Sequence, residues 1–209
     1  MNVIVIGATG TIGRLVVQDL LAEGHSVTAF ARHPEKLSLT HPALSLKAGD
    51  AQNEADVTAA VAGHDAVFVT LGAGMSRKSR IRSQGTLAVI RAMQATGVRR
   101  LVVQSTLGTH ETWSNLDFFW KRIMFGALLR PVHRDHELQE SLVRASGLDW
   151  TIVRPAAFSD GPATGRYQED FPPTERKLSL RISRADIAAF LARQLSESRY
   201  LGSAVSISN

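Results

Sequence analysis

Residues 3–13 read Val-Ile-Val-Ile-Gly-Ala-Thr-Gly-Thr-Ile-Gly, and this stretch decides the fold. A short β-branched run stops at Gly7, Gly10 and Gly13 follow at fixed spacing, and apolar residues then recur at helical intervals from Arg14. The pattern predicts a strand, a tight turn and the start of a helix. Gly7 permits the turn, Gly10 lets the backbone approach phosphates, and Gly13 lets the helix lie close to the strand. Such a turn is typical of a site that binds a dinucleotide pyrophosphate.

Strand and helix patterns alternate along most of the remaining chain. Apolar runs of strand length separated by helical patterns indicate parallel strands joined by right-handed crossovers. The predicted fold class is therefore α/β, a Rossmann-type doubly wound parallel sheet forming a single domain over residues 1–209. Further strands are expected at residues 25–31, 44–50, 65–71, 100–105 and 149–154, and helices at residues 53–62, 83–96, 134–145 and from 184 onward.

A ligand of such a sheet binds at the carboxyl ends of the strands. Turn residues begin at each predicted end, which indicates one shared crevice. These ends lie at residues 7–13, 32, 50, 71–74, 105–106 and 155–158. In the last third of the chain, Ser183 has the character of a helix N-cap, and Asp186 is expected to be structural rather than catalytic.

Composition excludes several classes of protein. The chain has 209 residues, 44% of them hydrophobic, and no cysteine, so disulfides, thiolate metal sites and a cysteine nucleophile are excluded and no metal site is predicted. No apolar run approaches the roughly 20 residues that span a bilayer, and we expect no signal peptide, since no basic n-region is visible. We expect a cytoplasmic protein without a membrane partner, as a monomer or a weak homodimer.

The net charge is +5, and its main local cluster is Arg77–Arg82. No aromatic interleaving or nucleic-acid motif accompanies this cluster, so no nucleic-acid partner is expected. An anionic cofactor or substrate explains the cluster with fewer assumptions.

The end of the second predicted strand bears on the choice of nucleotide. An acidic residue there binds the ribose hydroxyls of NAD, whereas this chain has Arg32, followed by Glu35 and Lys36. A guanidinium can pair with a 2′-phosphate and stack on adenine, so NADP(H) is preferred over NAD(H), although Glu35 weakens the argument. Asp50, followed by Ala51, is either a ligand of the adenine amino group or a turn-forming residue.

The usual proton donor of short-chain dehydrogenases, a Tyr-x-x-x-Lys pair, is missing. In that pair the lysine lowers the pKa of the tyrosine so that it can protonate an alkoxide. Tyr167 and Tyr200 are the two tyrosines, and neither has a lysine four residues later. Ordinary alcohol–ketone chemistry is therefore disfavoured.

Residues 7–13, Asp50, Ser105-Thr106 and the stretch from Asp135-His136 to Arg154-Pro155 resemble the atypical short-chain dehydrogenases/reductases. Residues 160–167, Asp-Gly-Pro-Ala-Thr-Gly-Arg-Tyr, narrow the resemblance to the NAD(P)H-binding, NmrA-like branch that includes biliverdin-IXβ reductase/flavin reductase. It covers nearly the whole chain. The resemblance implies hydride transfer to a flat conjugated acceptor such as a flavin, a quinone or a biliverdin-like compound.

The resemblance also implies roles for individual residues. Ser105 and Thr106 would stand at the catalytic position, where the reductases carry a serine. For the phosphates, the pyrophosphate would be bound by Thr9, Gly10, Thr11 and Ile12, and the 2′-phosphate by Arg32 and Lys36. The adenosine would lie against Leu71, Gly72 and Ala73. The nicotinamide riboside would be bound by Gln104, Ser105 and His136, and the nicotinamide would lie against Pro155 to Ala157.

Three positions depart from the family pattern. Ala157 stands where biliverdin reductase has a histidine, His136 where many relatives place the lysine of the Tyr–Lys pair, and Val132 where they place the tyrosine. These departures put tetrapyrrole reduction in question. His136 could also be a solvated surface residue.

An aromatic segment at residues 109–133 is longer than an ordinary connection, and it holds Trp113 and Phe119. Long insertions near a site often act as lids. Trp113, Phe118, Phe119 and Trp120 are candidates for an apolar platform under an aromatic acceptor, and Trp113 and Phe119, with Phe158, are predicted to contact the acceptor. Alternatively, a helix with Phe119, Ile123, Phe125 and Leu128 packs on the sheet or on a second subunit.

Three functions remain open at this point. One is an NADPH-dependent reductase of a conjugated acceptor, which the Ser105-Thr106 pair and the aromatic segment favour. Another is an NADP(H)-sensing, NmrA-like regulatory protein without turnover, which the missing Tyr–Lys pair favours. An epimerase or dehydratase of nucleotide sugars is disfavoured, because the chain is short for the usual substrate domain.

Overall fold

The computed structural model describes residues 1–74, 76 and 80–209. Arg77, Lys78 and Ser79 of the predicted basic cluster lie outside the described residues. The main sheet has the strand order β3-β2-β1-β4-β5-β6-β10-β8, and all neighbours are parallel except β10 and β8. These strands are β1 (Asn2–Ile6), β2 (Ser26–Ala31), β3 (Leu44–Ala48), β4 (Ala66–Val69), β5 (Arg100–Gln104), β6 (Asp149–Pro155), β8 (Gln168–Glu169) and β10 (Ser203–Ser208).

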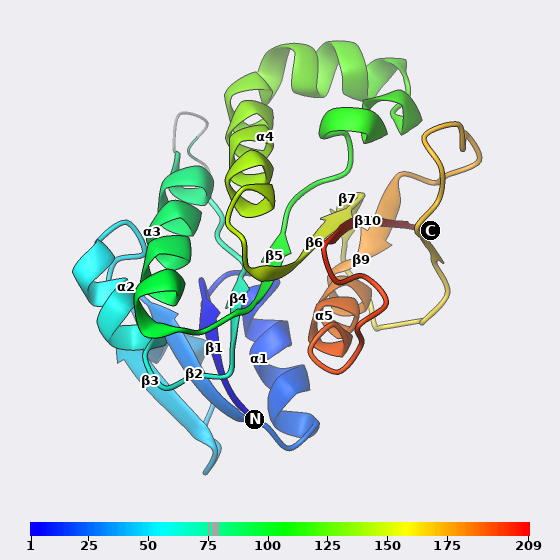
Figure 1. The fold of residues 1–209 in the computed structure, drawn as a ribbon. Coiled ribbons are helices and arrows are strands. Elements are labelled where there is room, and N and C mark those ends of the chain that lie inside the picture. Colours follow the sequence, from blue (N-terminus) through cyan, green and yellow to red (C-terminus); the bar gives the residue numbers. More distant parts are fainter. Residues whose placement is uncertain (75, 77–79) are drawn as a thin grey trace.

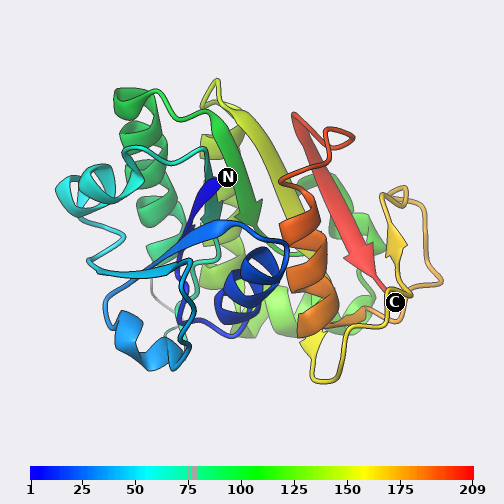
Figure 2. The ribbon, with the colours of Figure 1, turned by 90° about the horizontal axis from the view of Figure 1, so that it is seen from below.

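Helices cover both faces of the sheet (Figures 1 and 2). α1 (Gly13–Ala22) and α5 (Arg184–Arg193) lie together on one face. α2 (Glu54–Val61), α3 (Ile81–Thr96) and α4 (Arg130–Arg144) lie on the other. The result is the predicted doubly wound Rossmann fold in one domain.

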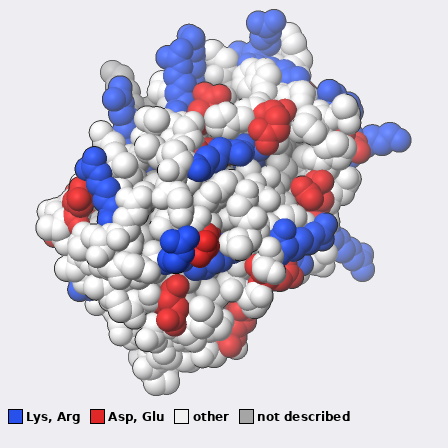
Figure 3. Space-filling model, in the orientation of Figure 1, with Lys and Arg blue, Asp and Glu red and all other residues white. Residues whose placement is uncertain are grey.

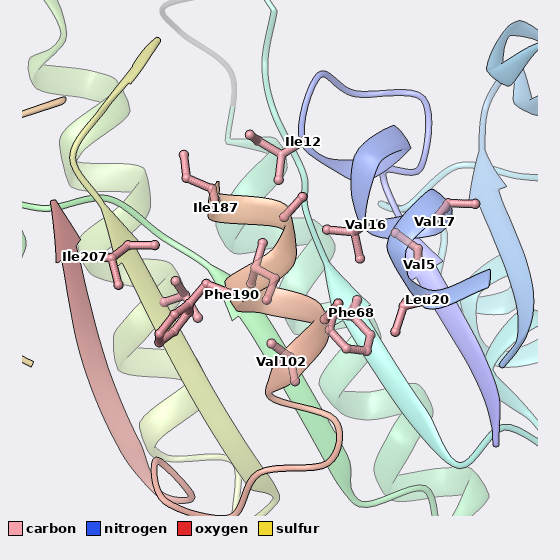
Figure 4. Packing of buried hydrophobic residues seen from close by; sticks show 14 of the residues in the cluster. Val5, Ile12, Val16, Val17, Leu20, Phe68, Val102, Ile187, Phe190 and Ile207 are labelled. Carbon is pink, nitrogen blue, oxygen red and sulfur yellow. The ribbon is translucent and has the colours of Figure 1, made fainter. Parts of the chain in front are cut away.

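The sheet is buried on both faces because its side chains alternate between two cores. On β1, Val3 and Val5 belong to the cluster that packs against α1 and α5 (Figure 4), whereas Ile4 and Ile6 belong to the cluster under α2, α3 and α4. Successive strand residues point to opposite faces, so a strand between two helical layers is apolar throughout. This explains the uninterrupted Val-Ile-Val-Ile run before Gly7.

The predicted strands and helices are present with bounds shifted by a few residues at most, apart from α4, which begins at Arg130 rather than residue 134. Ser183 caps α5 as expected, since its hydroxyl accepts the N–H of Asp186 at 2.9 Å. The Asp186 carboxylate in turn accepts the N–H groups of Thr164 and Gly165, both at 2.8 Å. Asp186 thus ties a loop to α5, which is a structural role.

The last third of the chain holds short strands that the sequence pattern does not predict. β10 pairs in parallel with β6, and β7 (Ala157–Ser159) pairs with β9 (Arg181–Ser183) in a separate two-stranded sheet. The β10 sequence, Ser-Ala-Val-Ser-Ile-Ser, alternates polar and apolar residues with little bulk. Its assignment as a strand depends on pairing with β6, which is remote in sequence.

The aromatic segment forms a 3₁₀ helix, η2 (His110–Asn115), and a π-helix, η3 (Phe119–Leu128), which runs across the upper part of Figure 1 beyond the carboxyl ends of the strands. Of the four residues expected to pack on the sheet or on a second subunit, only Phe125 packs into the core, and packing of the other three on a second subunit stays a prediction. Phe125 is 7% exposed, whereas Phe119, Ile123 and Leu128 are 51%, 43% and 45% exposed. In a π-helix, residues four or five apart share a face, so Phe125 turns away from the other three.

None of the helices in the described part of the chain has the length and apolarity that crossing a bilayer requires.

Candidate cofactor and acceptor site

A cavity of about 640 Å³ opens at the carboxyl ends of the central strands. The glycine turn lies at one end of its lining, and side chains from η3, β7 and the start of α4 lie at the other. Most of the predicted site residues line this cavity: Gly7, Thr9, Gly10, Thr11, Ile12, Arg32, Asp50, Ala51, Leu71, Gly72, Gln104, Ser105, Thr106, His136, Ala157 and Phe158.

The glycine turn leaves no room for side chains. Gly7 has a φ of +92°, and a Cβ there would lie 2.8 Å from the carbonyl oxygen of Thr70. A Cβ on Gly13 would lie 2.3 Å from the Gly7 carbonyl oxygen, and one on Gly10 would lie 3.2 Å from the same atom. Gly13 does not line the cavity. It allows α1 to approach β1 closely, as the sequence predicts.

The turn presents backbone donors at the N-terminus of α1. Within the described part of the chain, the N–H groups of Thr9, Thr11 and Ile12 have no hydrogen-bond acceptor, and α1 has neither a side-chain cap nor an acidic residue in its first turn. Free N–H groups and the helix dipole together attract anions. The close-packed turn and these donors fit a dinucleotide pyrophosphate.

At the adenosine end, Arg32 follows β2, lines the cavity and is exposed. The carboxylate of the neighbouring Glu35 lies 3.3 Å from the His33 ring, measured from Oε1 to Nδ1, and is not paired with Arg32. No ion-pair partner of Arg32 is found among the described residues. Lys36, on the short helix η1 (Pro34–Leu37), is exposed and does not line the cavity, and neither does Ala73. The geometry thus leaves the Arg32 guanidinium available to an anion.

Asp50 forms the expected turn, and its role as a ligand of the adenine amino group stays a prediction. One of its carboxylate oxygens accepts the N–H of Gln52 at 3.0 Å, which is a turn-forming bond, while the residue also lines the cavity. Ala51 lies beside it and is buried.

Ser105 is tied into a buried ionic network at the end of β5. Its hydroxyl donates to Glu140 Oε1 at 2.6 Å, and the Thr109 hydroxyl donates to the same oxygen at 2.7 Å. The guanidinium of Arg154 donates to both oxygens of Glu140, at 2.5–3.1 Å, and to Glu111. Burial alone would lower the pKa of Arg154, but the hydrogen bonds and charge of Glu140 outweigh it, so the pKa is raised.

Glu140 and Arg154 are fully buried, and neither was recognised from the sequence. The Ser105 hydroxyl donates to Glu140 while the residue also lines the cavity, so the catalytic role expected for Ser105 stays a prediction. The signal that could have revealed the network is a charged residue within a buried strand, Arg154, which requires a buried partner. Ser105 positions the strand end from which Thr106 projects.

Thr106 is half-buried and lines the cavity. Its hydroxyl makes a long hydrogen bond, 3.3 Å, to the carbonyl of Leu107, so it can reorient toward a bound molecule. Val132, Ala157 and His136, the three departures from the family pattern, line the same cavity. Thr106 is thus the hydroxyl available on this wall.

His136 is buried, 6% exposed, and is not a solvated surface histidine. Burial, reinforced by the positive charge of Arg82, lowers its pKa well below the usual value of 6.5, so its ring is neutral near pH 7. Its Nδ1 atom has no hydrogen-bond partner among the described residues. A buried, unpaired nitrogen in a cavity wall fits a ligand hydroxyl, as the ribose of a nicotinamide nucleotide would supply.

The far end of the cavity is apolar. Trp120 and Phe125 of η3 line it, and their rings pack at a tilt of 46° with centroids 5.5 Å apart. Trp113 and Phe119 do not line it, which gives the prediction of acceptor contact at these two residues no support, while Phe158 remains in the wall. The apolar and aromatic lining residues at this end are Leu107, Leu116, Trp120, Phe125, Leu129, Val132, Ala156, Phe158 and Leu180. Pro155, the last residue of β6, is buried and does not line the cavity.

A sequence profile of the NAD(P)H-binding family matches residues 7–198. The chain belongs to this NAD(P)H-binding family. The protein YMR090W of Saccharomyces cerevisiae is 30% identical over 206 residues, covering 93% of this chain and 87% of its own. The uncharacterized sugar epimerase YhfK of Bacillus subtilis is 28% identical, covering 94% and 89%.

Solved structures agree with this assignment. The anaerobilin reductase ChuY of Escherichia coli O157:H7 superposes with a TM-score of 0.79 at 25% identity, covering 99% of this chain and 96% of its own. The neighbours are atypical short-chain dehydrogenases/reductases of the NmrA-like kind, so the resemblance read from the sequence is confirmed. The protein is a member of an NAD(P)H-binding oxidoreductase family that includes reductases.

Arg82, the last residue of the predicted basic cluster, also lines the cavity. It lies at the start of α3, where Asp135 of α4 accepts the N–H groups of Arg82 and Ser83 and approaches the Arg82 guanidinium at 3.8 Å. Asp135 thus caps α3 from a neighbouring helix. Burial lowers the pKa of Arg82 despite the charge of Asp135, and its Nη1 atom lacks a hydrogen bond among the described residues.

Proposed function

We propose that the protein is an NADPH-dependent reductase that transfers a hydride to a flat, conjugated and largely apolar acceptor. The observation that carries the proposal is the continuity of the cavity, which joins the glycine turn to an aromatic wall. The relation to an anaerobilin reductase supports reductase chemistry on a conjugated molecule. Neither the acceptor nor the preference for NADPH follows from family membership alone.

The cofactor would lie across the carboxyl ends of the strands. The N–H groups of Thr11 and Ile12 would bind the pyrophosphate, Arg32 the 2′-phosphate, and His136 a hydroxyl of the nicotinamide ribose. When bound, NADPH supplies a hydride and leaves as NADP⁺. Ala157 and Phe158 would limit the space beside the nicotinamide.

The acceptor class follows from the wall that would hold it. Among the described residues, the arginine and lysine side chains lining the cavity are Arg32, which follows β2, and Arg82, at the start of α3, so neither belongs to the aromatic wall. Burying a carboxylate or a phosphate against that wall would leave the charge unpaired, which is costly. A quinone therefore suits the wall better than a flavin mononucleotide or a tetrapyrrole with carboxylate groups.

The chain would supply orientation and one hydrogen bond rather than an acid. Reduction of a quinone requires a hydride and a proton, and the oxygen that gains negative charge can accept a hydrogen bond from Thr106. His136 is held neutral by burial, so it has no imidazolium proton to give near pH 7. Solvent would provide the proton through the open side of the cavity.

A second function, NADP(H) sensing without turnover, is favoured by one observation. Val132 and His136 line the cavity where the Tyr–Lys pair of many relatives would stand, so acid catalysis by that pair is excluded. A sensor would bind NADP(H) tightly and oxidise none of it.

The deciding experiment follows NADPH oxidation by the purified protein with a short-chain quinone, riboflavin, FMN and biliverdin offered separately. NADH serves as the control cofactor, and a titration measures cofactor binding. We expect saturable oxidation that is fastest with the quinone. Tight NADPH binding without oxidation by any of the four acceptors would favour the sensor instead.

A further inference from the structure

The π-helix η3 has three distinct faces. Trp120, Phe125 and Leu129, spaced five and four residues apart, point into the cavity. Phe119, Ile123 and Leu128, spaced four and five apart, are 43–51% exposed, and Phe118 just before the helix is 74% exposed. These four exposed residues are called the outer apolar face below.

The third face is basic. Lys121, Arg122, Arg130 and Arg134 line one shallow hollow between η3 and the start of α4. Trp113 also lines this hollow, packed edge-on against His133 with ring centroids 5.2 Å apart. In Figure 3, basic side chains project from the upper edge of the molecule, where η3 and the start of α4 lie in Figure 1.

Carboxylates do not neutralise this basic face. Glu137 is the one acidic residue lining the hollow among the described residues, and it lies 3.6 Å from His133. Asp117, at the approach to η3, accepts the N–H of Trp120 at 2.9 Å. The Lys121 ammonium donates to the carbonyl of Ser114, which leaves its charge unpaired.

We propose that η3 binds the surface of an anionic lipid bilayer, with the outer apolar face in the acyl region and the basic face on the headgroup phosphates. Helices that lie in a membrane interface combine an apolar side bearing aromatic residues with a side rich in Lys and Arg. Trp113 stands beside the cations, as tryptophan does at the boundary between headgroups and water. Binding to the bilayer surface in this way departs from the expectation, drawn from the sequence, that the protein has no membrane partner.

A second copy of the chain fits this surface less well. A two-fold dimer places the same patch of each subunit in contact. It would bring both sets of four cations to one interface, where like charges repel. A bilayer of anionic lipid supplies the opposite charge and an apolar layer in the same plane.

The inner face of η3 forms part of the cavity wall, so docking would place the cavity next to the bilayer. A lipid-dissolved acceptor could then enter without crossing water. The docking itself does not depend on the proposed reductase activity, because the residues that would insert lie outside the cavity.

Flotation with vesicles tests the docking. Vesicles of phosphatidylglycerol and of phosphatidylcholine would be incubated with the full chain at low and high salt. We expect binding to phosphatidylglycerol that weakens with salt, and little binding to phosphatidylcholine. Phe119→Ser with Ile123→Ser, and separately Arg122→Glu with Arg134→Glu, should each weaken binding about tenfold or more.

Matched controls lie far from η3. Leu46→Ser removes an equally exposed leucine from β3 at the edge of the sheet, and Arg166→Glu reverses an exposed charge in a loop. Both should bind vesicles like the unaltered protein. An NADPH titration of every variant shows whether the site remains folded, and it keeps the outcome separate from the proposed reductase function.

Two results would overturn the proposal. One is failure of the unaltered protein to float with phosphatidylglycerol at low salt. The other is a dimer in sedimentation that dissociates in Phe119→Ser, because the outer apolar face would then be a subunit interface.

Discussion

The two ends of the cavity are built in different ways. The nucleotide end is built on one short local motif, the turn that holds Gly7, Gly10 and Gly13, together with the ends of parallel strands that the sheet brings beside it. The acceptor end consists of side chains from η3, α4, β7 and the chain before β9. Local geometry fixes the first end, whereas the second depends on the packing of an unusual helix. We expect changes at each end to affect different properties.

The largest effect should come from the ionic network between the two ends. Glu140→Ala leaves the fully buried Arg154 without its main partner. Breaking a buried pair in this way costs about 3–5 kcal/mol of unfolding free energy. Chemical denaturation measures the loss. As the control, Glu54→Ala breaks the exposed pair with Arg91 and should lower the unfolding free energy by at most about 1 kcal/mol. Equal losses of unfolding free energy in the two variants would show that the buried network adds little to stability.

Arg32→Glu should separate the two cofactors. It removes the cation expected to bind the 2′-phosphate and adds repulsion, so NADPH should bind about 100-fold more weakly while NADH changes little. Lys36→Glu, outside the cavity lining, should have a much smaller effect. Binding titrations with both cofactors decide the matter, and parallel losses for NADPH and NADH would remove Arg32 from phosphate recognition.

Trp120→Ala should affect the acceptor end alone. It removes one of the two rings that pack against each other in the cavity wall. We expect the KM for a quinone to rise about tenfold, with NADPH affinity unchanged. Trp113→Ala is the matched control, because Trp113 lies outside this cavity. If Trp113→Ala impairs quinone reduction as much as Trp120→Ala does, the assignment of Trp120 to the acceptor site is contradicted.

Thr106→Val should lower turnover and leave NADPH affinity nearly intact. It removes one hydroxyl from the wall and keeps the shape of the side chain. The loss of one hydrogen bond to the reacting acceptor corresponds to about a fivefold lower kcat. Steady-state kinetics and a cofactor titration measure the two quantities. Unchanged turnover would exclude Thr106 from the reaction.

The pH dependence of stability tests the burial of His136. Its pKa in the folded protein is lowered, whereas in the unfolded chain it should be near 6.5. As the pH falls below about 6.5, the unfolded chain takes up a proton that the folded protein does not, so stability is lost by up to about 1.4 kcal/mol per pH unit. His136→Gln should lose less between pH 7 and pH 5.5. Identical slopes in denaturant titrations would mean that His136 is accessible to protons.

The sequence predicts the nucleotide end well because that end depends on local rules. The spacing of the glycines, the apolar run of β1 and the position of Arg32 need no long-range information. The burial of Ser105 against Glu140 could not be predicted, since α4 and β5 meet through tertiary packing. Trp120 belongs to the predicted aromatic platform and lines the cavity, whereas Trp113 and Phe119 do not. This separation depends on the π-helical period of η3, which the local sequence pattern does not reveal.

The most direct test of the account compares NADPH with NADPH carrying deuterium at the transferred position of C4, using a short-chain quinone as acceptor. Absorbance of the reduced nicotinamide is followed in single turnovers of the purified protein. The account predicts that oxidation occurs and is slower with deuterium on one face of the nicotinamide and not on the other. An NADPH complex that forms and never oxidises, with quinone, riboflavin, FMN or biliverdin present, would contradict it.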